Sequence, residues 1–253
     1  MQDYRKRKVN EMSAAIEIKN LKKCFGTKTA VNDLNLTVEE GEIFSFLGVN
    51  GAGKTTTIRM LTGLSVPTSG NAYVMGHSIL TELDEVKKAG NLSPQETSVA
   101  PNLTVRENLE FIAGIYGFDK KKTAEREAEI IAQFDLEEVC DSKAKTLSGG
   151  WQRKLSIAMA LITEPKILYL DEPTLGLDVL ARRDLWKTIR ALKGKITIIL
   201  TTHYMEEAEE LSDRIAIMVK GNMAAIGTLE ELRKKTGKEK LEDIFVSIVE
   251  ENK

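Results

Sequence analysis

The sequence contains little that would indicate a membrane-spanning, disulfide-linked or nucleic-acid-binding protein. Its two cysteines, Cys24 and Cys140, lie far apart with no further Cys or His at metal-ligand spacing, so we expect two reduced thiols and no zinc site. No apolar run approaches the roughly 18 residues that can span a bilayer. The 36 Lys+Arg nearly balance the 38 Asp+Glu, so no global positive field attracts DNA or RNA. A function at a membrane would therefore require another chain to span it.

The chain is long enough for one large α/β domain, with room for a smaller inserted subdomain. It has 253 residues, of which 42% are hydrophobic and 29% charged, which excludes a disordered or fibrous protein. Residues 1–14 are expected to form a flexible tail. The basic run at residues 5–8 could contact a lipid surface, but short basic runs at a terminus are more often solvated and frayed.

Short apolar runs rich in β-branched residues recur along the chain, and most are separated by helical patterns. This alternation is typical of a sheet that is at least partly parallel. The predicted strands are residues 16–18, 34–38, 43–47, 72–74, 167–170, 196–200 and 215–219. The runs at 167–170 and 196–200 do not alternate between apolar and polar residues, so helices should cover both faces there.

Two segments have a helical pattern throughout. Between about Glu96 and Leu147 apolar residues recur at helical spacing, which predicts an inserted helical subdomain. The charged stretch at residues 119–129 within it is expected to be a solvated helix face and loop. Residues 228–253 are expected to form two short helices, the first capped by Thr228 with Glu231 three residues on.

Residues 48–55 fit the phosphate-loop pattern G-x-x-x-x-G-K-[ST], directly after the strand at 43–47 and before a helical run. The glycines allow backbone N–H groups to point at phosphate oxygens, and the helix N-terminus adds its positive dipole end. Lys54 would reach the β- and γ-phosphates, and Thr55 would offer its hydroxyl to Mg²⁺. A plain strand-to-helix turn would not explain Lys54 and Thr55 at these positions. The predicted phosphate-binding residues are Gly48, Asn50, Gly51, Ala52, Gly53, Lys54, Thr55 and Thr56.

A second apolar run ends in two carboxylates, Asp171 and Glu172. Consecutive strand residues point to opposite sides, so the two carboxylates are expected to have different tasks. Asp171 would support Mg²⁺ together with Thr55, and Glu172 would polarise the attacking water as general base. A buried acidic pair with no metal would be costly, which disfavours a purely structural role. His203 follows the run at 196–200 at the same sheet edge, where it would bond the γ-phosphate and orient the water, although a lone histidine is more often a surface or packed residue.

Kinases, GTPases, helicases and transport ATPases share the phosphate loop, and residues 147–153 discriminate among them. Ser148 precedes a helix predicted to run to about Thr163. Its hydroxyl, the backbone of Gly149 and Gly150, and the helix N-terminus form a second anion site. Two anion sites on separate helix starts in one chain suggest that two copies pair.

These motifs make the chain resemble the ATP-binding subunits of ABC transporters, over almost its whole length. The resemblance implies that residues 147–151 are the family's signature motif, which closes on the γ-phosphate of ATP held by a second subunit. It implies that Gln95 meets Mg²⁺ and joins the core to the helical subdomain. It also implies that residues 175–178 cross the dimer interface, with Asp178 as the acidic member. Phe25 matches the aromatic that stacks on adenine, and it also fits a half-buried residue at a strand end.

The resemblance implies an α/β fold with a P-loop NTPase core, a mixed, largely parallel sheet flanked by helices. An N-terminal antiparallel β part and an inserted α-helical subdomain accompany that core. The expected ATP-binding core comprises residues 15–95 and 148–227, and the inserted signature subdomain residues 96–147. Residues 228–253 would form a C-terminal helical extension.

The implied ligands are ATP and Mg²⁺, and the implied partners are a second ATP-binding subunit and separate integral membrane permease subunits. The protein would then lie on the cytoplasmic face of the cell membrane, with no nucleic acid bound. Thr55, Gln95 and Asp171 would hold the metal. The complete catalytic unit would combine two chains, with Lys54, Glu172 and His203 from one and Ser148, Gly149, Gly150 and Asp178 from the other.

The sequence departs from the family pattern in three places: Trp151 stands where glutamine is common, Val49 stands where proline is, and the family often has a glycine near Ser45. The segments at residues 227–232 and 241–245 resemble exporter-type subunits of the drug, sodium and polysaccharide-export group. The transported molecule is not encoded in this chain, because in such machines the membrane partner contacts it.

Two other functions stay open at this point. A soluble member of the same superfamily could remodel ribosomes or DNA, but such proteins usually carry two nucleotide domains in tandem or long coiled-coil insertions. A regulatory module that binds nucleotide without hydrolysis is disfavoured by the presence of Glu172 and His203.

Overall fold

The computed structural model describes residues 14–252 of the chain. Residues 1–13 of the predicted flexible tail, with the basic run at 5–8, lie outside the described residues. Ala14, the last residue of that predicted tail, is the first residue of strand β1 (Ala14–Phe25).

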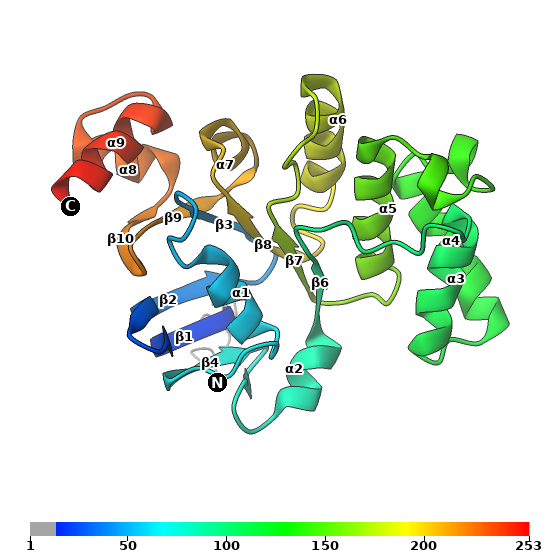
Figure 1. The fold of residues 1–253 in the computed structure, drawn as a ribbon, viewed down its shortest axis with the longest axis horizontal. Helices are drawn as coiled ribbons and strands as arrows, with labels where there is room; N and C mark the ends of the chain where they lie inside the picture. Colours follow the sequence, from blue (N-terminus) through cyan, green and yellow to red (C-terminus); the bar gives the residue numbers. More distant parts are fainter. Residues whose placement is uncertain (1–13, 253) are drawn as a thin grey trace, which may run out of the picture.

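Within residues 14–252 the strands form two sheets (Figure 1). The larger sheet has the order β10-β9-β3-β8-β7-β6, and all neighbours pair in parallel except β10 and β9. Its strands are β3 (Ile43–Leu47), β6 (Gly90–Ser93), β7 (Ile167–Asp171), β8 (Thr197–Thr202), β9 (Arg214–Val219) and β10 (Asn222–Gly227). This arrangement confirms the predicted mixed, largely parallel sheet.

The smaller sheet is antiparallel and has the order β2-β1-β4-β5. It joins β1 to β2 (Lys28–Glu39), β4 (Ser69–Val74) and β5 (His77–Ser78). The antiparallel part is therefore N-terminal as predicted, but it also takes in two strands that follow the phosphate loop in the chain.

The central strands alternate their side chains between two hydrophobic cores. Phe44, Tyr169 and Ile199 face helix α1 (Lys54–Leu61), which packs between the two sheets. On the other face, Leu168 and Ile198 pack with α5 (Gly149–Leu161) and α6 (Val179–Arg190), and α3 and α4 extend that core outward (Figure 1). Both faces of the parallel strands are thus covered by helices, as their continuous apolar runs predict.

The inserted segment forms α3 (Val105–Ile115), α4 (Lys120–Gln133) and two 3₁₀ turns, Glu137–Val139 and Ala144–Thr146. Helix was expected from about Glu96, but α3 begins only at Val105, where Thr104 and Glu107 form a capping box. In the stretch at 119–129, Asp119 caps α4 and the remaining residues lie within the helix, but not all of the stretch is solvated. Glu127 is buried and forms an ion pair with Arg106.

Helices α2 (Leu83–Ala89) and α7 (Met205–Leu211) complete the core, and α8 (Leu229–Thr236) and α9 (Leu241–Glu251) lie at the C-terminal end. The two C-terminal helices and the Thr228–Glu231 capping box are confirmed. Strands β6 and β10 were not predicted from the sequence, because glycine and polar residues interrupt their apolar pattern.

Among residues 14–252, none of the helices combines the length and the apolar character needed to cross a bilayer. Cys24 and Cys140 are free thiols, and both are half-buried.

Ile198 tests the core that supports the site. Its side chain is fully buried on β8. We expect Ile198→Ala to lower the free energy of unfolding by about 2–5 kcal/mol, because it removes buried apolar contacts and leaves a cavity. Urea unfolding measures this change. Val246→Ala on the exposed side of α9 is the matched control, with an expected change within about 0.5 kcal/mol; equal losses in the two variants would contradict the described packing.

Candidate functional site

The loop between β3 and α1 requires glycine at two positions. Gly53 has a φ of +107°, and a Cβ there would lie 2.4 Å from the carbonyl oxygen of Ala30. A Cβ on Gly48 would lie 2.6 Å from the carbonyl oxygen of Met218. Because neighbouring backbone approaches both residues so closely, a side chain at either position would displace the loop.

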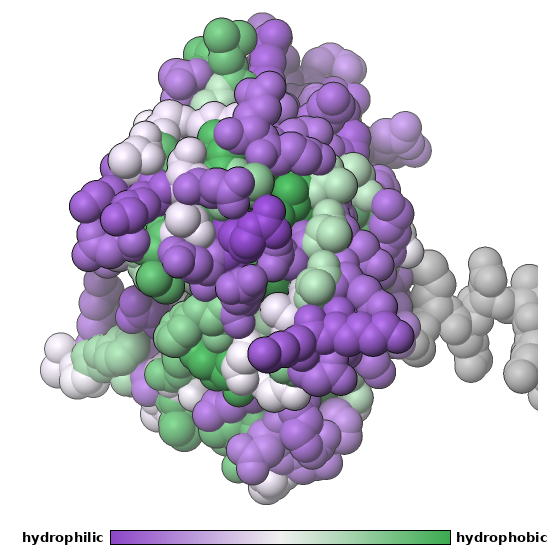
Figure 2. All heavy atoms as spheres, turned by 90° about the vertical axis from the view of Figure 1, so that its right-hand side faces the viewer, coloured by the Kyte–Doolittle hydropathy of each residue, from purple (hydrophilic) through white to green (hydrophobic). Residues whose placement is uncertain are grey.

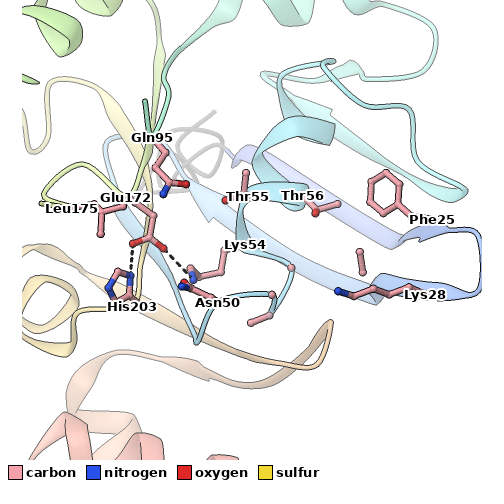
Figure 3. Close-up of a pocket in the computed structure, with 14 residues that line it drawn as sticks. Phe25, Lys28, Asn50, Lys54, Thr55, Thr56, Gln95, Glu172, Leu175 and His203 are labelled. Carbon is pink, nitrogen blue, oxygen red and sulfur yellow. Dashed lines mark hydrogen bonds and ion pairs between the residues drawn. The ribbon is translucent and has the colours of Figure 1, made fainter. Parts of the chain in front are cut away.

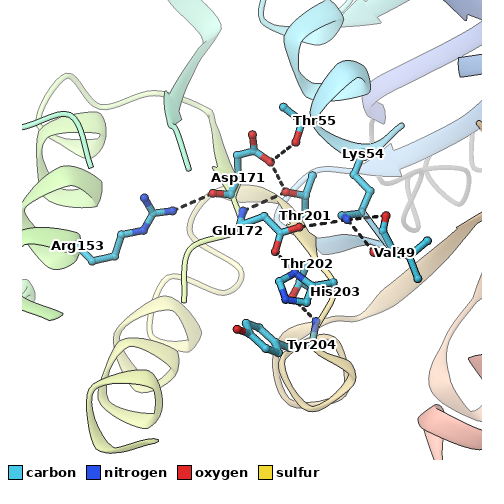
Figure 4. A network of polar contacts seen from close by, with 11 residues as sticks. Val49, Lys54, Thr55, Arg153, Asp171, Glu172, Thr201, Thr202, His203 and Tyr204 are labelled. Carbon is cyan, nitrogen blue, oxygen red and sulfur yellow. Dashed lines mark hydrogen bonds and ion pairs between the residues drawn. The ribbon is translucent and has the colours of Figure 1, made fainter. Parts of the chain in front are cut away.

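Lys54, the first residue of α1, folds back over this loop. Its ammonium donates to the carbonyl oxygens of Gly48 at 2.7 Å and Val49 at 3.3 Å. It also forms an ion pair with Glu172, with Nζ 3.1 Å from Oε1 (Figure 4). Lys54 and Glu172 are both only 5% exposed, so the two charges are buried as a pair.

Asp171 and Glu172 at the end of β7 point to different partners. The Thr55 hydroxyl donates to Asp171 Oδ1 at 2.9 Å, and the Thr201 hydroxyl donates to the same oxygen at 2.5 Å. Glu172 has a φ of +49°, a left-handed conformation that is uncommon outside glycine and often marks functional sites. The two carboxylates have separate partners, as expected, but β7 ends at Asp171, so the left-handed backbone of Glu172 separates them and strand alternation does not.

His203 directly follows β8 and faces Glu172. Its Nδ1 lies 2.5 Å from Glu172 Oε2, so Glu172 contacts both His203 and Lys54 (Figure 4). The His203 ring also packs on Tyr204, with 4.1 Å between ring centroids. The backbone N–H of Tyr204 donates to the Thr202 hydroxyl at 2.9 Å. The position of His203 is thus determined by contacts on two sides.

A cleft with a volume of about 470 Å³ brings most of the predicted site residues together (Figure 3). Gly48 and Asp171 do not line it. The Gly48 carbonyl bonds Lys54, and the Asp171 carboxylate bonds Thr55. The predicted residues that line the cleft are Phe25, Asn50, Gly51, Ala52, Gly53, Lys54, Thr55, Thr56, Gln95, Glu172 and His203. Lys28 and Ala30 also line it and were not predicted, because no motif marks them. Leu175 lines it too, although the sequence analysis placed it only in the segment expected to cross the dimer interface.

Four predicted residues, Ser148, Gly149, Gly150 and Asp178, do not line this cleft. Ser148 caps α5, and Asp178 caps α6 by accepting the backbone N–H groups of Leu180 and Ala181 at 2.9 and 3.0 Å. Ser148 and Gly150 border a separate hollow of about 260 Å³. Within one chain, these residues are not brought to the phosphate loop.

Arg153 is a buried residue of the site that the sequence analysis missed. It is 3% exposed, and its guanidinium donates to the carbonyl oxygens of Pro173 at 2.7 Å, Asp171 at 3.0 Å, Gln95 at 3.3 Å and Pro94 at 2.5 Å. Burial lowers the pKa of Arg153 to about 10. The cation therefore ties α5 to both the Asp171 and the Gln95 segments. From the sequence, an arginine beside Lys154 in a helix reads as a solvated charge.

Glu207, on α7, is a second missed residue. Its side chain is fully buried, and Trp186 Nε1 donates to its Oε1 at 3.1 Å. Burial raises the pKa of the Glu207 carboxyl, and the nearby Thr202 and Thr174 hydroxyls offset part of that rise. A glutamate at this position reads as part of the charged face of α7, so only the tertiary structure reveals its burial.

Comparison with known proteins identifies the family. The sequence profile described as ABC transporter matches residues 31–175. The chain belongs to the ABC transporter family. Curated members of the ABC transporter family that resemble it include the linearmycin resistance ATP-binding protein LnrL of Bacillus subtilis (strain 168), at 39% identity over 93% of this chain and 76% of LnrL. Another is the daunorubicin/doxorubicin resistance ATP-binding protein DrrA of Streptomyces peucetius, at 42% identity over 88% of this chain and 68% of DrrA.

A further relative is the human phospholipid-transporting ATPase ABCA3, which is 45% identical over 93% of this chain. The chain spans only 14% of the length of ABCA3.

Solved structures of ABC transporter subunits share the fold. An ATP-binding subunit of an ABC transporter superimposes with a TM-score of 0.82 at 30% identity, over 92% of this chain and 99% of that one. The ATP-binding cassette MJ0796, in a dimeric post-hydrolysis state with ADP and Pi, superimposes with a TM-score of 0.75 at 26% identity, over 84% and 98%. The predicted family and fold are confirmed, and the chain is an ATP-binding and ATP-hydrolysing domain of the ABC transporter type.

The buried Glu207 carboxyl predicts a pH dependence of stability. Because its folded-state pKa lies above the ordinary value of 4.5, its contribution is full below pH 4.5 and is lost as the pH rises through the folded-state pKa. Glu207→Gln keeps an acceptor for Trp186 and removes this loss. We therefore expect the variant to gain stability relative to the native protein as the pH rises above 4.5 in urea unfolding. Glu206→Gln, at an exposed carboxyl on the same helix, is the control. If the free energy of unfolding depends on pH in the same way in Glu207→Gln and in the native protein, the raised pKa of Glu207 is contradicted.

Proposed function

We propose that this chain is the ATPase subunit of an exporter, in which two copies close on two ATP molecules and drive separate membrane subunits. One observation carries the proposal. The Glu172 carboxylate lies between the Lys54 ammonium of the phosphate loop and the His203 ring, at one end of a cleft that Phe25 borders at the other (Figure 3).

The cleft fits a nucleoside triphosphate lying along it. Phe25 is 55% exposed, so its ring is available to stack on adenine. The triphosphate would then lie along the phosphate loop, over residues Asn50 to Thr56. These residues line the cleft and were predicted from the motif. The side chain of Lys28 lies in the same cleft and adds a positive charge on the side opposite Gln95 (Figure 3).

Thr55, Asp171 and Gln95 fit Mg²⁺. The Thr55 hydroxyl and Asp171 share a hydrogen bond, and Gln95 lines the cleft with Thr55. No cluster of three His, Cys, Asp or Glu side chains suited to a metal occurs within residues 14–252. Such a sparse donor set suits Mg²⁺, which usually keeps several waters and binds substrate phosphates with only one or two carboxylates. When bound, Mg²⁺ would neutralise charge on the β- and γ-phosphates.

Hydrolysis would proceed by attack of water on the γ-phosphorus. Glu172 accepts a proton from that water as the new P–O bond forms, and the bond to the bridging oxygen breaks to leave ADP. Lys54 stabilises charge on the transferring group. His203, held by Glu172 through Nδ1, has its second ring nitrogen available to orient the phosphate and the water.

A second copy would complete the site. Ser148, Gly149, Gly150 and Asp178 lie outside the cleft of their own chain, and Ser148 is exposed at the start of α5. The helix N-terminus at Ser148 favours an anion, which suits the γ-phosphate bound by the other chain. Exposed apolar side chains near these residues, Leu175, Val179 and Leu180, support an interface here.

The membrane partner is proposed to contact the side that carries α3. Phe111, Ile115 and Tyr116 are exposed there, and Pro94, Ile112, Tyr116 and Met159 line a hollow of about 180 Å³. Figure 2 shows apolar areas among the charged residues on this side of the molecule. A permease docked here would place the protein on the cytoplasmic face of the membrane. The names of LnrL and DrrA as resistance ATP-binding proteins support export.

We propose that the chain is divided into three parts. Residues 15–95 and 148–227 form the ATP-binding core, and residues 96–147 form the helical signature subdomain. Residues 228–253 form a C-terminal helical extension. The hydrogen bonds of the buried Arg153 to Pro94, Gln95 and Asp171 support a mechanical connection between the two segments of the core, 15–95 and 148–227.

Glu172→Gln tests the assigned base. We expect kcat for ATP hydrolysis to fall at least about 100-fold, because the amide cannot accept the proton from water, while ATP still binds with similar affinity. Phosphate release and equilibrium binding of ATP measure the two effects. Glu206→Gln, at an exposed carboxyl on α7, should retain native turnover. Native turnover in the Glu172→Gln variant would reject the proposed mechanism.

Ser148→Glu tests the site formed in trans. In the Glu172→Gln background, MgATP should convert monomers to dimers in sedimentation experiments, and Ser148→Glu should prevent this by placing a negative charge against the γ-phosphate. ATP binding by the monomer should stay within about twofold, because Ser148 lies outside the cleft of its own chain. Thr81→Glu adds the same charge at an exposed position outside the signature segment. Dimers formed equally by all these proteins would show that Ser148 does not face the nucleotide.

A further inference from the structure

Helix α6 contacts the segment that carries His203 through two side chains one helical turn apart. The Arg182 guanidinium carbon lies 4.6 Å from the centroid of the Tyr204 ring. Trp186, four residues later, donates its indole N–H to Glu207. Because residues at i and i+4 lie on the same helix face, one face of α6 contacts both ends of the segment from Tyr204 to Glu207.

The first contact continues to the reacting groups. Tyr204 packs its ring on His203 at 4.1 Å, and His203 bonds Glu172 (Figure 4). Arg182, Tyr204, His203 and Glu172 therefore form an unbroken series of contacts. A cation over an aromatic face is attractive, and the attraction increases when the pair is partly removed from water.

Among the residues that the structure describes, no ion pair explains the position of Arg182. Its Nε is buried and makes no hydrogen bond within residues 14–252. A buried donor without a partner costs free energy. Within the described residues, the interaction found for this side chain is its stacking on the Tyr204 ring. Its neighbour Arg183 is exposed and serves as an internal comparison.

The second contact anchors the same segment. The buried Glu207 carboxyl bonds Trp186 and lies near Thr202, whose hydroxyl accepts the Tyr204 backbone N–H. Movement of Tyr204 away from His203 would therefore disturb a partly buried hydrogen bond as well as a stacked pair. Without the Tyr204 ring, the imidazole would lack the packing that limits its rotation.

We propose that Arg182 and Tyr204 are positioning residues, which orient the His203 ring toward Glu172 for ATP hydrolysis. This inference rests on the proposed function, in which His203 acts at the γ-phosphate. Neither residue needs to touch ATP. Their effect is on the fraction of molecules in which the His203–Glu172 pair has the productive geometry.

Steady-state ATP hydrolysis tests this role. Tyr204→Leu and Arg182→Ala are expected to lower kcat about 5- to 20-fold while KM for ATP stays within about twofold. Tyr204→Phe retains the ring and should keep kcat within about twofold of the native value, as should Arg183→Ala, the charge-matched control on the same helix. Thermal melting of each variant confirms that it is folded. If Tyr204→Leu does not fold, Arg182→Ala alone carries the test.

A double-mutant cycle with His203→Ala separates positioning from a general structural effect. If Tyr204 and Arg182 act through His203, adding Tyr204→Leu or Arg182→Ala to His203→Ala should lower the residual single-turnover rate by less than about twofold. If the fold-losses of rate in the single variants multiply fully in the double variants, the proposal is wrong. Loss of ATP-induced dimers caused by Arg182→Ala in the Glu172→Gln background would also overturn it, because Arg182 would then act at the interface.

The outcomes also separate this inference from the proposed function. Native turnover in His203→Ala would reject the role of His203 itself. A severe loss in His203→Ala, together with native kcat in both Tyr204→Leu and Arg182→Ala, would reject the positioning role alone.

Discussion

The site depends on three adjacent parallel strands, β3, β8 and β7, that end at the same edge of the larger sheet. Every residue of these strands is buried, so helices must cover both faces and the functional groups lie at or just beyond the strand ends. The phosphate loop follows β3, His203 follows β8, and Asp171 ends β7 with Glu172 directly after it. Parallel pairing therefore brings together residues that are more than 100 positions apart in the chain.

Pairing of buried charges determines how the groups are arranged at that edge. Lys54 and Glu172 are both buried, and isolating either charge from water without a partner would be strongly unfavourable. The left-handed backbone at Glu172 directs its carboxylate to Lys54 and His203, while Asp171 bonds Thr55. Two neighbouring carboxylates thereby acquire separate partners, and only one of them lines the nucleotide cleft.

Two further buried ionisable side chains hold the surrounding elements. Arg153 binds four backbone carbonyl groups from the segments that contain Gln95 and Asp171, so α5 cannot move far without disturbing both. Glu207 connects α7 to Trp186 on α6, the helix that begins after Asp178. The elements that are proposed to meet a second copy are thus joined by polar contacts to the elements that carry Glu172 and His203.

The alternation of apolar runs and helical patterns in the sequence was enough to predict a partly parallel sheet, which the structure confirms. Local spacing and the ends of apolar runs also predicted the phosphate loop, the acidic pair and His203, and the structure brings Lys54, Glu172 and His203 into contact. The sequence did not reveal strands β6 and β10, whose polar residues are accommodated only through pairing with β7 and β9. Nor could it show that Arg153 and Glu207 are buried, since a charged residue in a helix has the same local pattern whether it faces water or the core. Burial and contact between distant segments are properties of packing, so only the tertiary structure decided them.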